Sequence, residues 1–279
     1  MGRSTAARTV DLPCTDRLIA LYRAVRAAVL NSGRESTGVT NAKGDEVKQF
    51  DLVANDAAVT FLSNLSVPLI IESEEAERRQ IGSGTPCYRL VLDPVDGSDN
   101  WARGLPLSAL SCAVMPIDAP LHPDGVESAI IGPLDQETPL VARKGSGAWR
   151  GAARLETSGV RHIADAVISI ELNHFAPPGG VARLMADARG VRCYGCASRA
   201  LAFVASGATD AHVDVRGRLT PESYLAAARL VIEAGGCVTG CDGAPLPAAR
   251  SLSDRTGLIA AASRALCDEI VERLSDGGL

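Results

Sequence analysis

The feature that most constrains this chain is a strand-like segment that leads directly into an acidic turn. Residues 88–92 alternate in polarity like a half-buried β-strand, and the sequence DPVDGS follows at residues 93–98. Pro94 fixes one backbone dihedral and Gly97 permits a tight turn, so we expect the strand to end at Leu92. The turn then brings two carboxylates and a main-chain carbonyl to one point at the end of a strand.

The oxygen atoms at this turn match the preferences of a hard cation. Asp93, the carbonyl of Val95 and Asp96 are donors of the kind that Mg²⁺ takes, with water and substrate phosphate completing its shell. A second acidic cluster follows another strand-like segment and consists of Glu72, Glu74 and Glu75. Like charges packed this closely need a cation, whereas the alternative is that both clusters are solvated turns.

Gly97, Ser98 and Asp99 are placed to open a short helix after the acidic turn. The free N–H groups at a helix start form an anion site that suits a phosphate. A metal site beside a phosphate site indicates metal-assisted hydrolysis of a phosphate ester.

A further carboxylate falls on an apolar stripe nearer the N-terminus. Residues 51–65 read as a helix whose core-facing positions include Leu52, Val59 and Leu62, and Asp56 lies on the same stripe. A core-facing carboxylate is costly unless it is paired or bound to a cation. We therefore interpret Asp56 as either a packing anomaly or a site residue.

Composition excludes several classes of protein. The 279 residues carry 28 Lys and Arg against 33 Asp and Glu, and this net charge of −5 argues against nucleic acid as a partner. No apolar run approaches the roughly 18 residues of a membrane span, and no signal-like segment opens the chain, so we expect a soluble cytoplasmic protein. A zinc site is conceivable but less favoured than buried free thiols, and its ligands would be Cys193, Cys196, Cys237 and Cys241.

The character of the chain changes near residue 156. Short strand-like runs dominate before it, while strands and helices alternate after it. We therefore expect an α+β half at residues 1–155 that carries the metal-binding motifs, and an α/β half at residues 156–279 that closes the substrate site.

Several separated motifs resemble those of the inositol monophosphatase family, which shares a superfamily with fructose-1,6-bisphosphatase. The stretch LVLDPVDGSDNWARGLPLSALSCAV resembles the family signature, and VARKGSGAW, YGCASRALAFVASGATDAHVD and IEAGG follow in the family's order. The segment GDEVKQFDLVAND, residues 44–56, is closer to the bisphosphatase version. The resemblance covers nearly the whole chain and implies a layered αβαβα sandwich.

The resemblance also implies roles for individual residues. Mg²⁺ would be held by Glu74, Asp93, the Val95 carbonyl and Asp96, with Asp56 behind the ligands. Glu74 and the hydroxyl of Ser98, where the family usually has Thr, would orient the attacking water, and the amides of Gly97 and Ser98 would hold the phosphate. The family also tends to form dimers, so a homodimer is expected.

One position departs from the family pattern. Counting back from residues 234–236, the last metal carboxylate of the family falls on Ser223, and serine is a poor Mg²⁺ ligand. The neighbouring Glu222 is either the substitute ligand or a charge that favours the helix dipole. Asp214 lies near the family's contact to substrate hydroxyls, although a solvated strand-end charge is the other interpretation.

These observations predict a Mg²⁺-dependent phosphomonoesterase that acts on a small polyol or sugar phosphate, by default an inositol monophosphate. Two alternatives remain: a fructose-1,6-bisphosphatase-like enzyme, suggested by residues 44–56, and a non-catalytic phosphate-ligand binding protein, suggested by Ser223. No stretch like N-Y-x-x-R-Y, which holds the second phosphate in the bisphosphatases, is present.

Overall fold

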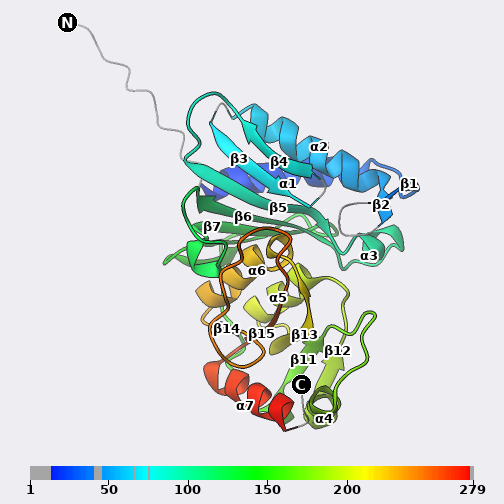
Figure 1. Ribbon diagram of the computed structural model, residues 1–279, viewed down its shortest axis with the longest axis vertical. Helices are drawn as coiled ribbons and strands as arrows, with labels where there is room; N and C mark the ends of the chain where they lie inside the picture. Colours follow the sequence, from blue (N-terminus) through cyan, green and yellow to red (C-terminus); the bar gives the residue numbers. More distant parts are fainter. Residues whose placement is uncertain (1–13, 41–45, 66, 75, 277–279) are drawn as a thin grey trace, which may run out of the picture.

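Three layers of helices and two β-sheets alternate through the molecule (Figure 1). The structure is a computed structural model, and it describes residues 14–40, 46–65, 67–74 and 76–276. The outer layer at one end is formed by α1 (Thr15–Leu30) and α2 (Gln49–Ser63), and the layer at the other end by α4 (Gly179–Asp187) and α7 (Arg264–Ser275). Between the two sheets lie α5 (Ala197–Ala205) and α6 (Pro221–Glu233). The predicted αβαβα sandwich is confirmed.

The first sheet has eight strands in the order β10-β9-β8-β7-β6-β5-β3-β4. All its neighbours are antiparallel except β3 and β5, which run parallel. The strands are β3 (Leu69–Ser73), β4 (Ala76–Ile81), β5 (Tyr88–Asp96), β6 (Ala109–Pro116), β7 (Ser128–Pro133), β8 (Leu140–Arg143), β9 (Gly147–Arg150) and β10 (Ala153–Leu155). A separate two-stranded sheet consists of β1 (Ser36–Thr40) and β2 (Glu46–Lys48).

The expectation that the central strand ends at Leu92 is wrong. Strand β5 continues to Asp96, with Asp93 opposite Ser111 and Asp96 opposite Ala109 on β6, and the register shifts between these two pairs. Pro94 lies within the irregularity, where a bulged strand tolerates a residue that has no N–H to donate. The acidic residues are therefore fixed on a strand and not on a loose turn.

The second sheet has five strands in the order β12-β11-β13-β15-β14. Strand β11 runs parallel to both its neighbours, and β15 runs antiparallel to β13 and β14. The strands are β11 (Val167–Ile170), β12 (Gly190–Arg192), β13 (Ala211–Leu219), β14 (Cys237–Thr239) and β15 (Thr256–Ala261). This sheet starts after the first one has ended, so each half of the chain forms one sheet.

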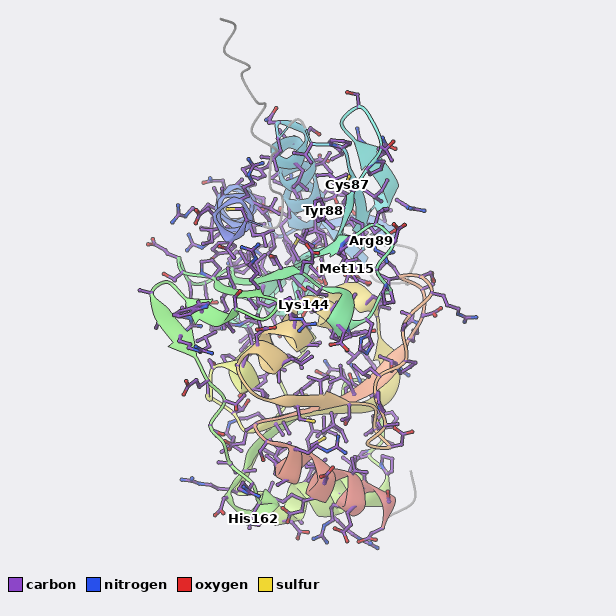
Figure 2. The ribbon with its side chains drawn as sticks, turned by 90° about the vertical axis from the view of Figure 1, so that its left-hand side faces the viewer. Cys87, Tyr88, Arg89, Met115, Lys144 and His162 are labelled. Carbon is purple, nitrogen blue, oxygen red and sulfur yellow. The ribbon has the colours of Figure 1, made fainter. Side chains whose placement is uncertain are left out.

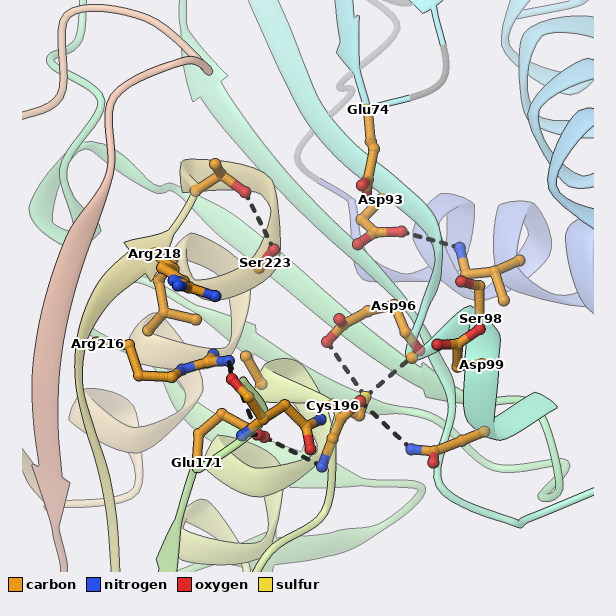
Figure 3. Close-up of a pocket in the computed structure, with 18 of the residues that line it drawn as sticks. Glu74, Asp93, Asp96, Ser98, Asp99, Glu171, Cys196, Arg216, Arg218 and Ser223 are labelled. Atoms are coloured by element: carbon orange, nitrogen blue, oxygen red, sulfur yellow. Dashed lines mark hydrogen bonds and ion pairs between the residues drawn. The ribbon is translucent and has the colours of Figure 1, made fainter. Parts of the chain in front are cut away.

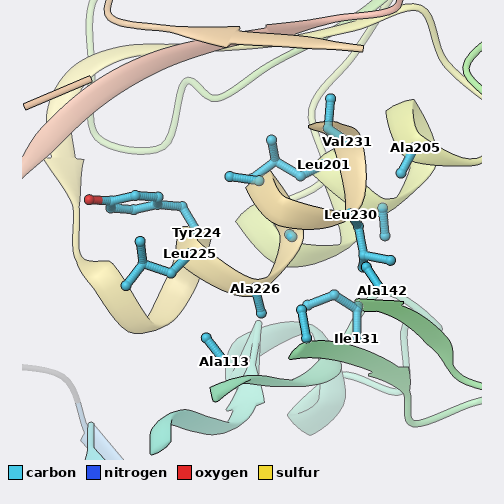
Figure 4. Packing of buried hydrophobic residues seen from close by; sticks show 14 of the residues in the cluster. Ala113, Ile131, Ala142, Leu201, Ala205, Tyr224, Leu225, Ala226, Leu230 and Val231 are labelled. Carbon is cyan, nitrogen blue, oxygen red and sulfur yellow. The ribbon is translucent and has the colours of Figure 1, made fainter. Parts of the chain in front are cut away.

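Helix α6 joins the two halves by packing between the sheets. Figure 4 shows its Ala226 and Leu230 facing Ala113, Ile131 and Ala142 of the first sheet. The small alanines let the helix approach the strands closely, and each fully buried leucine contributes about 1.5–3 kcal/mol. One face of the first sheet is therefore covered by a helix that belongs to the second half of the sequence.

Helix α2 shows a different buried face from the predicted one. Its buried residues are Phe50, Asp51, Ala54, Ala58 and Leu62, whereas Asp56 and Leu52 are exposed. The prediction that Asp56 faces the core is wrong because the two alanines, and not Leu52 and Val59, form the centre of the packed stripe. Asp51 is the carboxylate on that face.

Side chains fill the spaces between the layers, and Met115 of β6 is fully buried among them (Figure 2). Across the described residues, no helix has the length and apolar character needed to span a bilayer.

Candidate active site

A cavity of about 470 Å³ opens between the two halves of the chain (Figure 3). The half that comes first in the sequence lines it with the carboxylates Asp51, Glu74, Asp93, Asp96 and Asp99. The opposite side comes from β13, the start of α6 and the segment before β15, and carries Arg216, Arg218, Arg255, Thr220 and Ser223. The two walls of the cavity are therefore oppositely charged.

Strand β5 supplies the centre of the acidic wall. Asp93 is buried and accepts a hydrogen bond from the N–H of Val95 at 3.0 Å. Asp96 accepts one from the N–H of Ser198 at 2.7 Å and one from the thiol of Cys196 at 3.2 Å. These two bonds cross from the second half of the chain, so the Asp96 carboxylate is positioned by both halves. Burial, and to a smaller extent the charge of Glu74, raises the pKa of Asp96.

Asp51 is a cavity residue that the sequence interpretation missed. It is 4% exposed and accepts a hydrogen bond from the N–H of Lys48 at 2.9 Å, at the start of α2. Burial raises its pKa to about 6, and the neighbouring charge of Glu74 adds to the shift. The row formed by Asp51, Ala54, Ala58 and Leu62 at helical spacing could have identified it if alanine had been counted as a core residue.

The acidic wall offers donors of the type that a hard divalent cation takes. Side-chain oxygens of Glu74, Asp93 and Asp96 line the cavity together with Val95, which has a main-chain carbonyl. Burial is the main cause that raises the pKa values of Asp51 and Asp96, and the nearby charge of Glu74 adds to both shifts. Within the described part of the chain, however, no three His, Cys, Asp or Glu side chains converge as a ready-made metal site.

Glu75 lies outside the described residues, and Glu72 is held elsewhere by Arg78 at 3.3 Å.

The turn after β5 depends on glycine. Gly97 has φ = 79°, and a Cβ added there would lie 2.9 Å from both the Leu107 carbonyl and the Cβ of Cys196. This close approach places Gly97 and Ser98, the first residue of α3 (Ser98–Ala102), at the cavity as predicted. α3 is only one turn long.

Asp214 does not line the cavity. Asp214 is fully buried and forms an ion pair with Arg216. The Nη2 of Arg216 lies 2.7 Å from Oδ2 of Asp214, and its Nε donates a hydrogen bond to Oδ1 at 3.1 Å. Arg216 also approaches Glu171 at 3.8 Å. The expected substrate contact at Asp214 is therefore wrong: this carboxylate orients an arginine that faces the cavity. Alternation along β13, which puts Asp214 and Arg216 on one face, is the signal that could have shown the pair.

Arg218 and Arg255 differ from Arg216 in their surroundings. Both are exposed at the cavity, and neither forms an ion pair or side-chain hydrogen bond with any of the described residues. The sequence interpretation assigned them no role.

The start of α6 resolves the ambiguity between Glu222 and Ser223. Ser223 lines the cavity, and its hydroxyl lies 3.3 Å from that of Thr220. Glu222 is 1% exposed and is not among the residues that line the cavity. It lies near Tyr224, and burial together with the charge of Glu222 raises the pKa of Tyr224 to about 12. The expectation that Glu222 is a metal ligand is wrong, because adjacent helical residues are rotated by about 100° from one another.

The segment after β11 adds Asn173 and His174 to the cavity lining, and the sequence interpretation assigned neither of them a role. His174 has φ = 54°, a left-handed backbone that is uncommon outside glycine. Its neighbour Glu171 is held by the N–H groups of Asn173 at 3.0 Å and Gly195 at 3.1 Å.

The cysteines do not form the zinc site that was considered. All eight are free, and the four candidates have different neighbours: Cys193 contacts Glu171, Cys196 contacts Asp96, Cys237 contacts Cys267, and Cys241 contacts the Asp214 carbonyl.

Several known proteins have sequences similar to this chain. The model of the inositol monophosphatase family matches residues 15–277. A fructose-1,6-bisphosphatase/inositol-1-monophosphatase from Thermococcus kodakarensis is 30% identical over 237 residues, which are 85% of this chain and 86% of that protein. Inositol monophosphatase 2 of Mus musculus is 30% identical over 236 residues, which are 80% of this chain and 76% of that protein.

The solved structures agree at the level of the fold. An inositol monophosphatase (IMPase) from Thermotoga maritima superposes with a TM-score of 0.76 at 24% identity, covering 94% of this chain and 96% of that one. Together with the family match, this shows that the chain belongs to the inositol monophosphatase family and is a phosphoric monoester hydrolase.

Proposed function

We propose that this enzyme is a Mg²⁺-dependent phosphomonoesterase that uses water to hydrolyse small polyol or sugar phosphates. The observation that carries the proposal is the row of carboxylates on one wall of a single cavity, which includes Glu74, Asp93 and Asp96. Such a wall repels a phosphate ester by itself, so a cation must mediate between them.

Glu74, Asp93, Asp96 and the Val95 carbonyl would hold the ion. When bound, Mg²⁺ would supply a water of lowered pKa and neutralise charge on the phosphate. Burial, and to a smaller extent the charge of Glu74, raises the pKa of Asp96, and a bound cation would stabilise the ionised form of this carboxylate.

The protein's own groups have distinct tasks in this proposal. The N–H of Ser198 and the thiol of Cys196 hold the Asp96 carboxylate in one orientation. The hydroxyl of Ser98 and the carboxylate of Glu74 face the cavity. There the hydroxyl can donate a hydrogen bond to the attacking water, and the carboxylate can accept one from it. The bend at Gly97 brings Ser98 against the cavity without a side chain in between.

Phosphate release tests the proposal. Purified protein is assayed with inositol 1-phosphate and a panel of sugar phosphates, before and after chelation and after Mg²⁺ is restored. We expect activity to vanish on chelation and to return with Mg²⁺. Asp96→Asn should lower kcat/KM by at least about 100-fold, because the amide keeps the shape but removes a charge at the ion.

The exposed Asp56 provides the matched control: Asp56→Asn should leave kcat/KM within about twofold of the wild type. Melting curves show whether each variant is folded. Full hydrolysis after exhaustive metal removal, or a folded Asp96→Asn protein with wild-type turnover, would overturn the metal-dependent mechanism.

A further inference from the structure

The wall that faces the carboxylates carries two kinds of arginine. Asp214 and Glu171 largely neutralise Arg216, which is 13% exposed. The guanidinium groups of Arg218 and Arg255 also line the cavity but have no such partner among the residues that the structure describes. Two unpaired positive charges therefore face the same space.

The second sheet sets these two arginines beside each other. Leu219 of β13 pairs with Thr256 of β15, and Arg218 and Arg255 each come one residue before a member of that pair. This pairing brings the two arginines to the same end of β13 and β15, and both line the cavity. Asp254, the acidic neighbour of Arg255, pairs with Arg250 at 3.2 Å and does not neutralise Arg255.

The position of the arginines separates them from the reacting phosphate. Figure 3 shows Arg218 and Ser223 across the cavity from Glu74, Asp93 and Asp96. In the proposed reaction the phosphate lies at the carboxylate wall with its cation, so the arginine wall faces the alcohol part of the substrate. The hydroxyl groups of an uncharged polyol can accept hydrogen bonds from guanidinium groups, but only an anion can also neutralise their charge.

We propose that Arg218 and Arg255 form a subsite for a second anionic group, a phosphate or carboxylate, at the far end of the substrate. The preferred substrates are then doubly anionic sugar or sugar-acid phosphates. Guanidinium groups bind both anions through charge-assisted hydrogen bonds. This inference rests on the proposed function, because the phosphate to be hydrolysed defines which end of the substrate is distal.

Matched pairs of substrates isolate the second anion. Fructose 1,6-bisphosphate is compared with fructose 1-phosphate, and 6-phosphogluconate with glucitol 6-phosphate, under the same Mg²⁺ concentration. The members of each pair share the phosphate ester and differ in the distal anion. We expect kcat/KM to be about tenfold or more higher for at least one doubly anionic member, mainly through KM, and this preference to shrink at high salt.

Variants connect the preference to the two arginines. Arg218→Gln and Arg255→Gln should each raise KM for the preferred doubly anionic substrate by about tenfold and leave the singly anionic partner within about twofold. Arg218→Lys should retain part of the preference because it keeps the charge. Arg264→Gln, on the exposed surface of α7, is the control and should change neither substrate.

Binding to the metal-free protein gives a readout that does not require turnover. Without the cation the carboxylate wall should weaken the binding of both compounds. Calorimetric titration should still show tighter binding of the preferred doubly anionic compound than of its partner, and the Arg218→Gln/Arg255→Gln double variant should lose this difference.

The possible failures are distinguishable. If no phosphate ester is hydrolysed with Mg²⁺, the proposed function fails. If both members of each pair are hydrolysed equally well and the arginine variants behave like the wild type, the subsite is refuted while the function stands. Equal losses of kcat for both members would also refute it, because the arginines would then act on the shared reacting group.

Discussion

At the scale of single residues, Asp51 shows how burial changes the chemistry of a carboxylate. Its pKa is raised from 3.8 to about 6, mainly by loss of water. At a pH between these two pKa values, Asp51 keeps its proton in the folded protein and releases it in the unfolded chain. The free energy of unfolding therefore falls as the pH rises from about 4 to 6, by roughly 2–3 kcal/mol for this group.

Asp51→Asn should remove that part of the pH dependence. Urea unfolding at pH 4, 5, 6 and 7, in a buffer containing a chelator, measures it. The variant should lose less stability than the wild type across this range, whereas Asp56→Asn, on the exposed side of the same helix, should follow the wild type. Parallel curves for Asp51→Asn and the wild type would show that Asp51 titrates normally.

Ser223 and Glu222 make a second comparison between neighbours. Because Ser223 faces the cavity, Ser223→Asp should add a ligand for the cation and lower the Mg²⁺ concentration for half-maximal activity several-fold. Glu222→Gln changes a buried group behind the wall, so it should alter stability and leave the Mg²⁺ requirement unchanged. Magnesium titrations of both variants decide the matter, and the reverse order would mean that Glu222 reaches the ion.

At the scale of elements, the junction between β5 and α3 requires a residue without a side chain. Gly97→Ala combines a left-handed backbone with contacts at 2.9 Å, and we expect a loss of about 2–4 kcal/mol in unfolding free energy together with reduced turnover. Gly145→Ala has a similar φ of 72° but open space around it, so its cost should be about 1–2 kcal/mol. Chemical denaturation compares them, and equal losses would mean that the contacts relax freely.

The same junction shows how an element can be positioned by a distant one. The thiol of Cys196 and the N–H of Ser198, at the start of α5, hold the carboxylate at the end of β5. About 100 residues separate these groups in the chain. The acidic wall therefore takes its final form only when the two halves are packed together.

At the scale of the whole molecule, α5 and α6 connect the two sheets. Helix α6 packs against the first sheet, so neither half covers all of its apolar surface by itself (Figure 4). We therefore expect the chain to unfold in one cooperative transition, although the sequence divides at residues 155–156.

Two spectroscopic probes test this expectation. Both tryptophans, Trp101 and Trp149, lie in the first half, so their fluorescence follows that half alone, while far-UV circular dichroism follows both. The two denaturation curves should coincide. A fluorescence transition displaced from the dichroism transition would identify the halves as independently folding domains.

The features that could be predicted from the residues alone are local ones. The acidic segment at residues 93–98 and the glycine at position 97 are short-range patterns, and they were sufficient to indicate the centre of the cavity. The layered fold was expected from the resemblance to the inositol monophosphatase family. Pro94 misled the interpretation because a bulge can absorb a residue that lacks an N–H.

Which charged side chains face one another depends on how the elements pack, and the residue patterns alone did not predict it. Asp51 lines the cavity instead of Asp56 because the rotation of α2 about its axis depends on what packs against it. At α6, for the same reason, Ser223 lines the cavity and Glu222 does not. Asp214 forms an ion pair with Arg216, whereas Arg218 and Arg255 line the cavity opposite the carboxylate wall. Packing between elements sets these relations: the helical row through Asp51 and the alternation along β13 are present in the sequence, but they do not show which face meets the cavity.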